Sequence, residues 1–202
     1  VQLDCDVRDY VFSDINTFQA AKIYAGHNSE FNEVTWFYPS ASSTENDRYV
    51  TFNYRERIWY FGALSRTCWQ DRGVYEEPLA MNASGVLYQH ETGLTDAGAT
   101  RVGQVFLQSG PIERGNGDRV MSLTHLIPDI LSTPSAVQVT LKMRTTPQSD
   151  EYEAGPYLLD YDNGYTPIRA TGRTAALYVE QIADALWSLG HMRLEATAGG
   201  RR

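Results

Sequence analysis

Short strand signals that recur at intervals of roughly 8–15 residues constrain the fold of this chain more than any other feature. In each segment, side chains alternate as they do on the two faces of a β-strand, and glycine, proline, asparagine or aspartate ends the run. Short connections favour pairing between neighbouring strands. We therefore predict an all-β fold built from antiparallel meanders. The segments are residues 33–38, 48–54, 58–61, 64–69, 85–93, 101–110, 119–129, 135–145, 155–162, 172–181 and 191–198.

Only two segments have a helical pattern. Residues 13–25 begin with a serine that is typical of helix starts, but they end in residues that favour strands. Residues 182–186 could add one helical turn. Neither segment changes the predicted fold class.

The spacing of the strand signals also suggests how the chain is divided. Four-stranded units of about 40–50 residues are typical of propeller blades, and residues 19–69 would form one such unit. The chain holds about three or four units, whereas most closed propellers have ~4–8 blades. We expect propeller-like blades over residues 1–94, followed by a β-sandwich or further blades over residues 95–202.

Composition excludes several classes of function. The net charge is −8 and the basic residues are scattered, which argues against a surface that binds nucleic acid or anionic lipid. No apolar run reaches the ~18 residues of a membrane span, and no secretory leader is visible. The chain starts at Val1 rather than at methionine, which suggests processing or the end of a longer protein. Cys5 and Cys68 lie far apart and are predicted to be idle thiols.

No catalytic motif stands out in the sequence. The four histidines occur singly, and neither a serine-hydrolase elbow nor a phosphate-binding loop is present. Residues 160–164 (DYDNG) match the start of a calcium loop, but an Asn-Gly hairpin turn fits better because the later glutamate is missing. We predict a protein that is not an enzyme and that has no cofactor. Paired carboxylates could still cleave a glycosidic bond; the candidates are Glu30, Glu33, Asp47, Glu56 and Asp71.

Nine aromatic residues crowd into residues 32–62. Because they occupy consecutive positions in two strands, both faces of those strands are aromatic, whereas a platform for sugars or bases would be one-sided. Two-sided aromatic strands indicate burial on both faces, either in a stack of sheets or at a subunit contact. A ligand platform is the third possibility. The candidate packing and interface residues are Trp36, Phe37, Tyr38, Trp59, Tyr60 and Trp69.

Long strings in the chain resemble the tail nozzle proteins of short-tailed bacteriophages, also called tail hub or packaged-DNA stabilisation proteins. They are DYVFSDIN (residues 9–16), AGHNSEFNEVTWFYPSASSTENDRYVTFNYRERIWYFGALSRTCWQDRG (residues 25–73), SGPIERGNGDRVMSLTHLIPD (residues 109–129), IRATGRTAALYVEQ (residues 168–181) and LWSLGHMRLEATAGGRR (residues 186–202). The resemblance covers nearly the whole chain, with residues 10–72 and 103–129 the most telling. Family members are usually much longer, so the resemblance implies the C-terminal part of such a protein or a shorter relative.

The resemblance implies a structural virion protein. Nozzle proteins are β-rich, propeller-containing subunits of a homo-oligomeric ring that surrounds the DNA exit channel and retains packaged DNA until ejection. The implied partners are other copies of the chain, tail proteins on the portal and adaptor side, fibres or a needle, and double-stranded DNA that passes without specific contact. The implied location is the virion tail, and the host cytoplasm during assembly. The alternative is a carbohydrate-binding or glycan-cleaving tail module, with a stacking platform formed by some of Trp36, Tyr38, Trp59 and Trp69.

Overall fold

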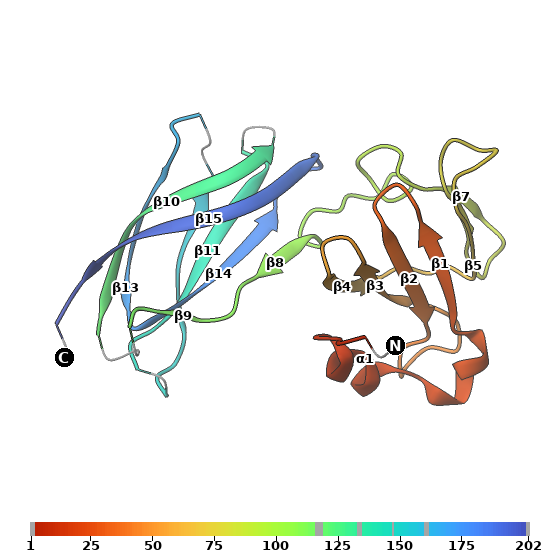
Figure 1. The fold of residues 1–202 in the computed structure, drawn as a ribbon, viewed down its shortest axis with the longest axis horizontal. Helices are drawn as coiled ribbons and strands as arrows, with labels where there is room; N and C mark the ends of the chain where they lie inside the picture. The colour runs from red at the N-terminus through yellow and green to blue at the C-terminus, as the bar shows by residue number, and fades with distance from the viewer. Residues whose placement is uncertain (1–2, 116–118, 133–134, 147, 160–161, 201–202) are drawn as a thin grey trace. The chain divides into compact units, whose positions relative to one another are not determined.

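The computed structural model describes residues 3–115, 119–132, 135–146, 148–159 and 162–200. The chain forms two compact units, Val1–Gly93 (unit 1) and Leu94–Arg202 (unit 2). Antiparallel strands dominate both units (Figure 1), which confirms the prediction of an all-β fold. Neither of the two helices described comes near the roughly 20 residues that a membrane-spanning helix needs.

Unit 1 contains a four-stranded sheet and a three-stranded sheet. The larger sheet is an antiparallel meander in the order β1-β2-β3-β4, and the smaller one has the order β5-β6-β7. A short helix and a 3-10 helix precede the strands. The elements are α1 (Arg8–Asp14), η1 (Thr17–Lys22), β1 (Tyr24–Asn28), β2 (Glu33–Tyr38), β3 (Arg48–Asn53), β4 (Ile58–Ala63), β5 (Cys68–Gln70), β6 (Leu79–Met81) and β7 (Leu87–Gln89).

Two predictions for unit 1 are wrong: the helix over residues 13–25 and the strand over residues 64–69. Residues 13–25 do not form one helix. α1 ends at Asp14, η1 ends at Lys22, and the chain is extended from Ile23 into β1, which begins at Tyr24. The strand-favouring residues at the end of this segment outweigh its helical start. Residues 64–69 are not the fourth strand either, because Thr67 N donates to Met81 O and β5 pairs with β6.

The alternation of side chains divides the β1-β2-β3-β4 sheet into two faces. The helix face packs against α1 and the N-terminal segment, and the β5 face contacts β5. The helix face carries Val34, Trp36, Tyr38, Val50, Trp59 and Phe61, and the β5 face carries Gly26, Thr35, Phe37, Tyr49, Thr51 and Tyr60. The chain itself therefore packs against both faces of this sheet and leaves much of β4 exposed.

Unit 2 consists of two antiparallel sheets. One has the order β13-β10-β15, and the other has the order β12-β11-β14-β8, with β9 also paired to β14. The predicted helical turn at residues 182–186 is absent from this described stretch. The elements are β8 (Phe106–Gln108), β9 (Ile112–Glu113), β10 (Met121–Ser132), β11 (Val137–Arg144), β12 (Tyr152–Leu158), β13 (Thr166–Gly172), β14 (Thr174–Gln181) and β15 (Trp187–Ala198).

One continuous core joins the two sheets of unit 2. Leu123 and Leu126 of β10 pack with Val139 and Leu141 of β11 and with Val179 of β14. Residues of β13 alternate strictly between buried and exposed, as expected for a strand with one face on the core. Unit 2 is thus a β-sandwich, in which the hydrophobic side chains of both inner faces interdigitate.

Candidate functional site

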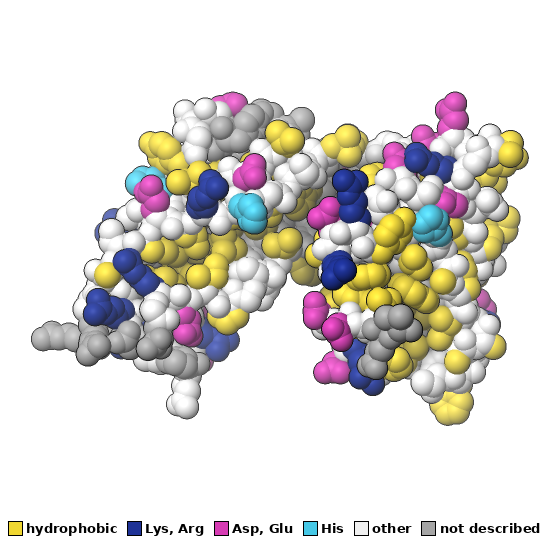
Figure 2. Space-filling view, viewed as in Figure 1, with side chains coloured by type: hydrophobic (Ala, Val, Ile, Leu, Met, Phe, Trp, Pro, Cys, Tyr) yellow, Lys and Arg dark blue, Asp and Glu magenta, His cyan; other side chains and the backbone are white. Residues whose placement is uncertain are grey.

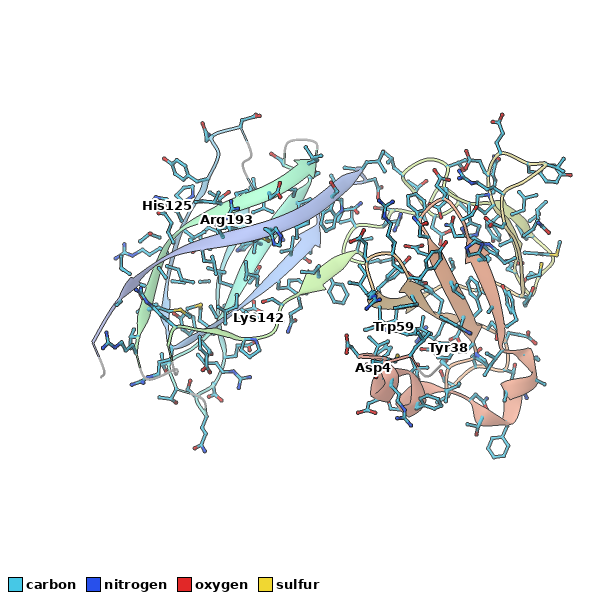
Figure 3. The ribbon with its side chains drawn as sticks, viewed as in Figure 1. Asp4, Tyr38, Trp59, His125, Lys142 and Arg193 are labelled. Carbon is cyan, nitrogen blue, oxygen red and sulfur yellow. The ribbon has the colours of Figure 1, made fainter. Side chains whose placement is uncertain are left out.

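The six predicted packing and interface residues lie on β2, β4 and β5 of unit 1. Phe37 and Tyr38 are each only 1% exposed, whereas the three tryptophans are partly buried and Tyr60 is partly exposed. Figure 3 shows Tyr38 and Trp59 within this unit, with Asp4 near Trp59. The six side chains therefore fall into a buried group and a group at the border with solvent.

On the helix face, aromatic side chains hold the N-terminal segment. The rings of Trp36 and Trp59 stack with their centroids 5.8 Å apart. Trp59 Nε1 donates a hydrogen bond of 2.8 Å to the backbone oxygen of Asp4. The rings of Tyr10 and Phe61 stack at 3.9 Å. Trp59 and Phe61 of β4 therefore hold the N-terminal segment against the sheet, at Asp4 and at Tyr10 respectively.

The buried tyrosine of the helix face belongs to the same cluster. Tyr38 packs with Val11 of α1 and Val50 of β3. Burial raises the pKa of the Tyr38 hydroxyl to about 12, because an ionised phenolate would lose its hydration there. Tyr38 therefore stays neutral throughout the physiological range and acts as a packing residue.

On the β5 face, Phe37 lies at the centre of an aromatic cluster. Its ring centroid is 5.1 Å from that of Tyr24, 6.0 Å from that of Trp69 and 6.4 Å from that of Tyr49. Trp69 also lies over Gly26, where an added Cβ would be 2.6 Å from Trp69 Cγ. These contacts join the two sheets of unit 1 and leave no space at Gly26 for a larger residue.

The aromatic side chains do not form one ligand platform. Trp36, Tyr38 and Trp59 belong to the helix face, whereas Trp69 contacts the opposite face. Trp59 is occupied by its partners on the N-terminal segment and Tyr38 is almost completely buried. The four side chains of the alternative carbohydrate platform therefore do not lie on one common surface, although Trp36 and Trp59 stack on the same face.

Tyr60 forms a polar cluster with the start of β2. Burial raises the pKa of the Glu33 carboxyl, and hydrogen bonds from Tyr60 and Asn53 partly offset this rise. Burial and the neighbouring Glu33 raise the pKa of the Tyr60 hydroxyl. Tyr60 therefore keeps its proton and donates a hydrogen bond to Glu33, and its side chain is partly exposed. Below this pair, Thr35 and Thr51 share a hydrogen bond of 2.8 Å.

The strand that carries Trp59 and Tyr60 is also an open edge. Among the strands that the structure describes, β4 pairs only with β3. Leu64 N donates to Asp47 O over 3.1 Å, and hydrogen-bonded pairs alternate along an antiparallel ladder. The ladder therefore uses the backbone groups of residues 58, 60 and 62, and those of Trp59, Phe61 and Ala63 point away from β3.

Apolar side chains border this open edge. Ile58 is 55% exposed, Phe61 39% and Tyr60 38%. Hydrophobic side chains gather on the surface of unit 1 in Figure 2, among scattered basic and acidic ones. Natural proteins usually protect such edges with charges, prolines or bulges, because an exposed apolar edge recruits another strand. The β4 edge (residues 58–63) is the surface of unit 1 best suited to bind another chain.

Four of the five candidate carboxylates have partners, each at a different position in unit 1. Asp47 accepts hydrogen bonds from Ser40 N (2.7 Å) and Ser40 Oγ (2.8 Å), which closes the loop between β2 and β3. Glu30 lies 3.7 Å from an Arg72 nitrogen, and Glu56 lies in the turn before β4. Glu33 and Asp71 bind different partners, Tyr60 and His27. Local contacts therefore account for four of the five carboxylates, and Glu56 is exposed in its turn.

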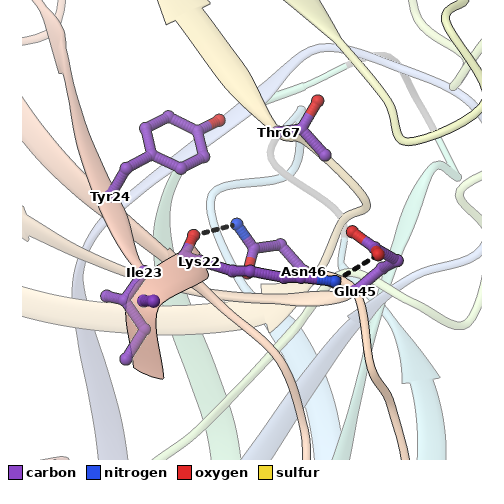
Figure 4. A pocket seen from close by; sticks show the side chains of 7 residues that line it. Lys22, Ile23, Tyr24, Glu45, Asn46 and Thr67 are labelled. Carbon is purple, nitrogen blue, oxygen red and sulfur yellow. Dashed lines mark hydrogen bonds and ion pairs between the residues drawn. The ribbon is translucent and has the colours of Figure 1, made fainter. Parts of the chain in front are cut away.

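A small recess lies between η1 and the β2–β3 loop (Figure 4). Its volume is about 330 Å³, and Lys22 forms an ion pair with Glu45 at this site. Asn46 Nδ2 donates to Lys22 O over 2.9 Å, which fixes the orientation of the amide. Asn46 Oδ1 and the Tyr24 hydroxyl are buried without a hydrogen-bond partner in the described part of the chain. The contacts of Lys22 and Asn46 tie this loop to the end of η1.

The structure also locates the residues considered for metals and thiols. Within the described ranges, no three His, Cys, Asp or Glu side chains gather as metal ligands would. Cys5 is partly buried, Cys68 is exposed, and both are free thiols. Asp162 and Asn163 form a turn, but the flanking strands β12 and β13 belong to different sheets, so the predicted hairpin is wrong; Asp160 lies outside the described residues.

Sequence reasoning missed that two histidines have carboxylate partners. His27 Nδ1 is 3.0 Å from Asp71 Oδ2, and His125 Nδ1 is 2.8 Å from Glu195 Oε2. His27 and Asp71 are 44 positions apart in the sequence, and His125 and Glu195 are 70 positions apart. Only the folded arrangement of strands and loops therefore reveals the two contacts. The antiparallel register that opposes His125 to Glu195 is a property of the finished sheet.

The chain matches no protein-family model and no curated protein. The resemblance to tail nozzle proteins therefore stays a prediction from the sequence.

Proposed function

We propose that the chain is a structural subunit of the tail of a short-tailed bacteriophage, and that it is part of the ring-shaped nozzle or hub that retains packaged DNA and channels it during ejection. The observation that carries this proposal is the open β4 edge with its exposed apolar side chains. The strings that resemble nozzle proteins supply the class of assembly. On this proposal the protein is not an enzyme, and it acts in the virion after assembly in the host cytoplasm.

The partner that we propose for the β4 edge is a second copy of the chain. A ring needs a heterologous contact that closes by rotation, in which one surface of each copy binds a different surface of the next. An unpaired strand provides a directional contact of this kind, since its backbone hydrogen bonds fix the register of the added strand. The exposed Ile58 and Phe61 side chains add the apolar area that stable interfaces bury.

The distribution of charge is consistent with DNA that passes without binding. Unit 1 has 13 acidic and 7 basic residues, and unit 2 has 12 acidic and 10 basic residues. Each basic contact to a phosphate would add salt-dependent affinity, which would slow ejection. Other tail proteins on the portal and adaptor side, fibres or a needle would complete the assembly. We also propose that the β1-β2-β3-β4 meander is a propeller-like blade, because such blades are four-stranded antiparallel sheets.

Electron microscopy of tails purified from the phage that encodes the chain tests the proposed location. The expected image is a closed ring of identical subunits around the tail axis, and antibodies against the chain should label that ring. The chain found only as a monomer on the virion, or away from the DNA channel, would overturn the proposal.

A pair of lysine variants tests whether the β4 edge makes the contact. Ile58→Lys places a charge on the edge, whereas Val74→Lys places the same charge at an almost fully exposed apolar residue elsewhere in unit 1. Both changes should alter the free energy of unfolding by no more than about 0.5 kcal/mol. We expect Ile58→Lys to abolish incorporation into tails, measured by quantitative immunoblotting, and Val74→Lys to leave it unchanged. Equal incorporation of the two variants would exclude the β4 edge.

A further inference from the structure

Asp71, His27 and Tyr54 form a chain of polar contacts at one end of the β1-β2-β3-β4 sheet. His27 belongs to β1, Tyr54 follows β3, and Asp71 follows β5. His27 Nδ1 lies 3.0 Å from Asp71 Oδ2, and His27 Nε2 lies 3.3 Å from the Tyr54 hydroxyl. The order of groups is carboxylate, imidazole and hydroxyl, which is the order in which a general base activates an oxygen nucleophile.

The carboxylate at the start of this chain is held by three further hydrogen bonds. Asp71 Oδ1 accepts from Ser29 N and Ser29 Oγ, both at 3.2 Å, and from Arg72 N at 2.8 Å. Burial opposes ionisation of Asp71, but the hydrogen bonds from Ser29 and Arg72 outweigh it and hold the pKa of this carboxyl below its ordinary value. An imidazole with its only proton on Nδ1 would donate to the Asp71 carboxylate and leave Nε2 free to accept the Tyr54 proton.

We propose that Asp71, His27 and Tyr54 act as a proton relay that makes the Tyr54 hydroxyl a nucleophile toward activated acyl donors, so that Tyr54 is a site of acylation. In the first step, the Tyr54 proton moves to His27 Nε2 while the phenol oxygen forms a bond to the carbonyl carbon. In the second step, the bond between that carbon and the leaving group breaks, and the leaving group takes the proton from Nε2. The product is an O-acyl tyrosine, and His27 returns to its starting form.

Two features suit the Tyr54 hydroxyl to a reaction with an acyl donor. Tyr54 is 44% exposed, so an acyl donor can reach its hydroxyl. The contact of 3.3 Å between His27 Nε2 and the hydroxyl is long, as hydrogen bonds to nucleophiles often are before substrate binds. This activity is separate from the assembly contact proposed for the β4 edge and does not depend on it.

The chain contains its own matched control in unit 2. Glu195 and His125 form a second carboxylate–imidazole pair, with 2.8 Å between Glu195 Oε2 and His125 Nδ1. Tyr165 is 47% exposed, nearly the same as Tyr54, but its ring meets the His125 ring edge to face, with centroids 5.0 Å apart. The two tyrosines therefore differ mainly in whether the hydroxyl is hydrogen-bonded to the imidazole.

Acetylation by N-acetylimidazole tests the relay in the intact chain. Peptide mass spectrometry after short exposures gives a separate rate for each tyrosine, and Tyr54→Phe confirms the assigned peptide. We expect Tyr54 to react at least about tenfold faster than Tyr165, below the ~10²–10⁴-fold range for enclosed general bases because the site is open to water. A ratio of rates near one would overturn the proposal.

Two variants test whether Asp71, as a positioning residue, acts on Tyr54 through the His27 imidazole. Asp71→Asn would favour the His27 tautomer with its proton on Nε2, which cannot accept the Tyr54 proton. His27→Gln removes the base and leaves the anchors of Asp71 in place. Each variant should lower the Tyr54 rate to that of Tyr165 and leave the Tyr165 rate unchanged. Partial unfolding would instead raise the rates of buried tyrosines such as Tyr38, and a Tyr54 rate that neither variant lowers would refute the relay.

Discussion

Replacement of Phe37 by alanine should remove a large part of the stability of unit 1. The side chain is almost fully buried, and its ring lies 5.1 Å from that of Tyr24 and 6.0 Å from that of Trp69, within the range that aromatic pairs prefer. Truncation of a buried phenylalanine to alanine costs about 3–5 kcal/mol through lost burial and the cavity left behind. We expect about 4 kcal/mol here, because the surrounding rings and the adjacent sheet restrict collapse of the cavity.

Urea unfolding followed by tryptophan fluorescence measures this loss. A unit of this size has a total stability of roughly 5–14 kcal/mol, so the variant loses about a third or more of it. The midpoint should fall by at least about 1 M urea. Trp187 is the only tryptophan of unit 2, so a Trp187→Phe background makes the signal report unit 1 alone.

A matched phenylalanine provides the control for this experiment. Phe18 is almost fully exposed, and Phe18→Ala should change the free energy of unfolding by less than about 0.5 kcal/mol. A loss below about 1 kcal/mol for Phe37→Ala would refute the reasoning, because a ring that packs both sheets together cannot be dispensable. It would also reopen the possibility that these aromatic residues serve a ligand.

Three further changes test separate parts of unit 1. Gly26→Ala should cost about 1–3 kcal/mol in urea unfolding, since the new Cβ would lie 2.6 Å from Trp69 Cγ, whereas Gly73→Ala, with nothing nearby, should cost almost nothing; equal effects would contradict the close packing. Glu33→Gln should stabilise the unit at pH 7, because a folded-state pKa raised above 4.5 gives a contribution to stability that is present below that value and lost as the pH rises. The gain should shrink as the pH is lowered to 4, and a gain independent of pH would contradict it. Asp71 should contribute stability above pH 3.8 that is lost as the pH falls through its lower folded-state pKa; thermal melts of Asp71→Asn should therefore show a weaker acid destabilisation than the wild-type chain, and identical slopes would count against this contribution.

The strands with clear alternation could be predicted from sequence almost to the residue. β2 has the predicted bounds, and β3 and β4 differ from prediction only at their ends. Proline after Tyr38 and the polar loop that follows supply stops that do not depend on distant contacts. The aromatic run of β2 is buried or partly buried at every position, whereas β4 keeps Ile58, Tyr60 and Phe61 exposed, so burial on both faces holds for β2 and not for β4.

Strands that depend on their pairing partners were missed. β1 follows η1 without a turn signal, and it is a strand because β2 pairs with it along its full length. β13 contains Pro167, which argues against a strand, but β13 is an edge strand, where proline is tolerated. The antiparallel partner, rather than local sequence, decides both cases.

At the candidate site too, the sequence identified individual residues but not the contacts that depend on how the strands pair. Sequence identified Trp59 and Tyr60 as interface candidates, but could not show that β4 would be an edge. That outcome depends on the chain leaving the sheet after Leu64, so that Thr67 N donates to Met81 O instead of extending β4 or adding a fifth strand. The relay of His27 and Asp71 was likewise invisible, since its two groups come from different sheets.

Amide hydrogen exchange along β4 is the most direct test of the proposed assembly contact. It should be measured at single-residue resolution on the isolated chain and on purified tails. We predict that the outward amides of Trp59, Phe61 and Ala63 exchange rapidly in the isolated chain and slowly in the tail, while the inward amides of residues 58, 60 and 62 are protected in both. Rapid exchange of the outward amides in the assembled tail would contradict the account.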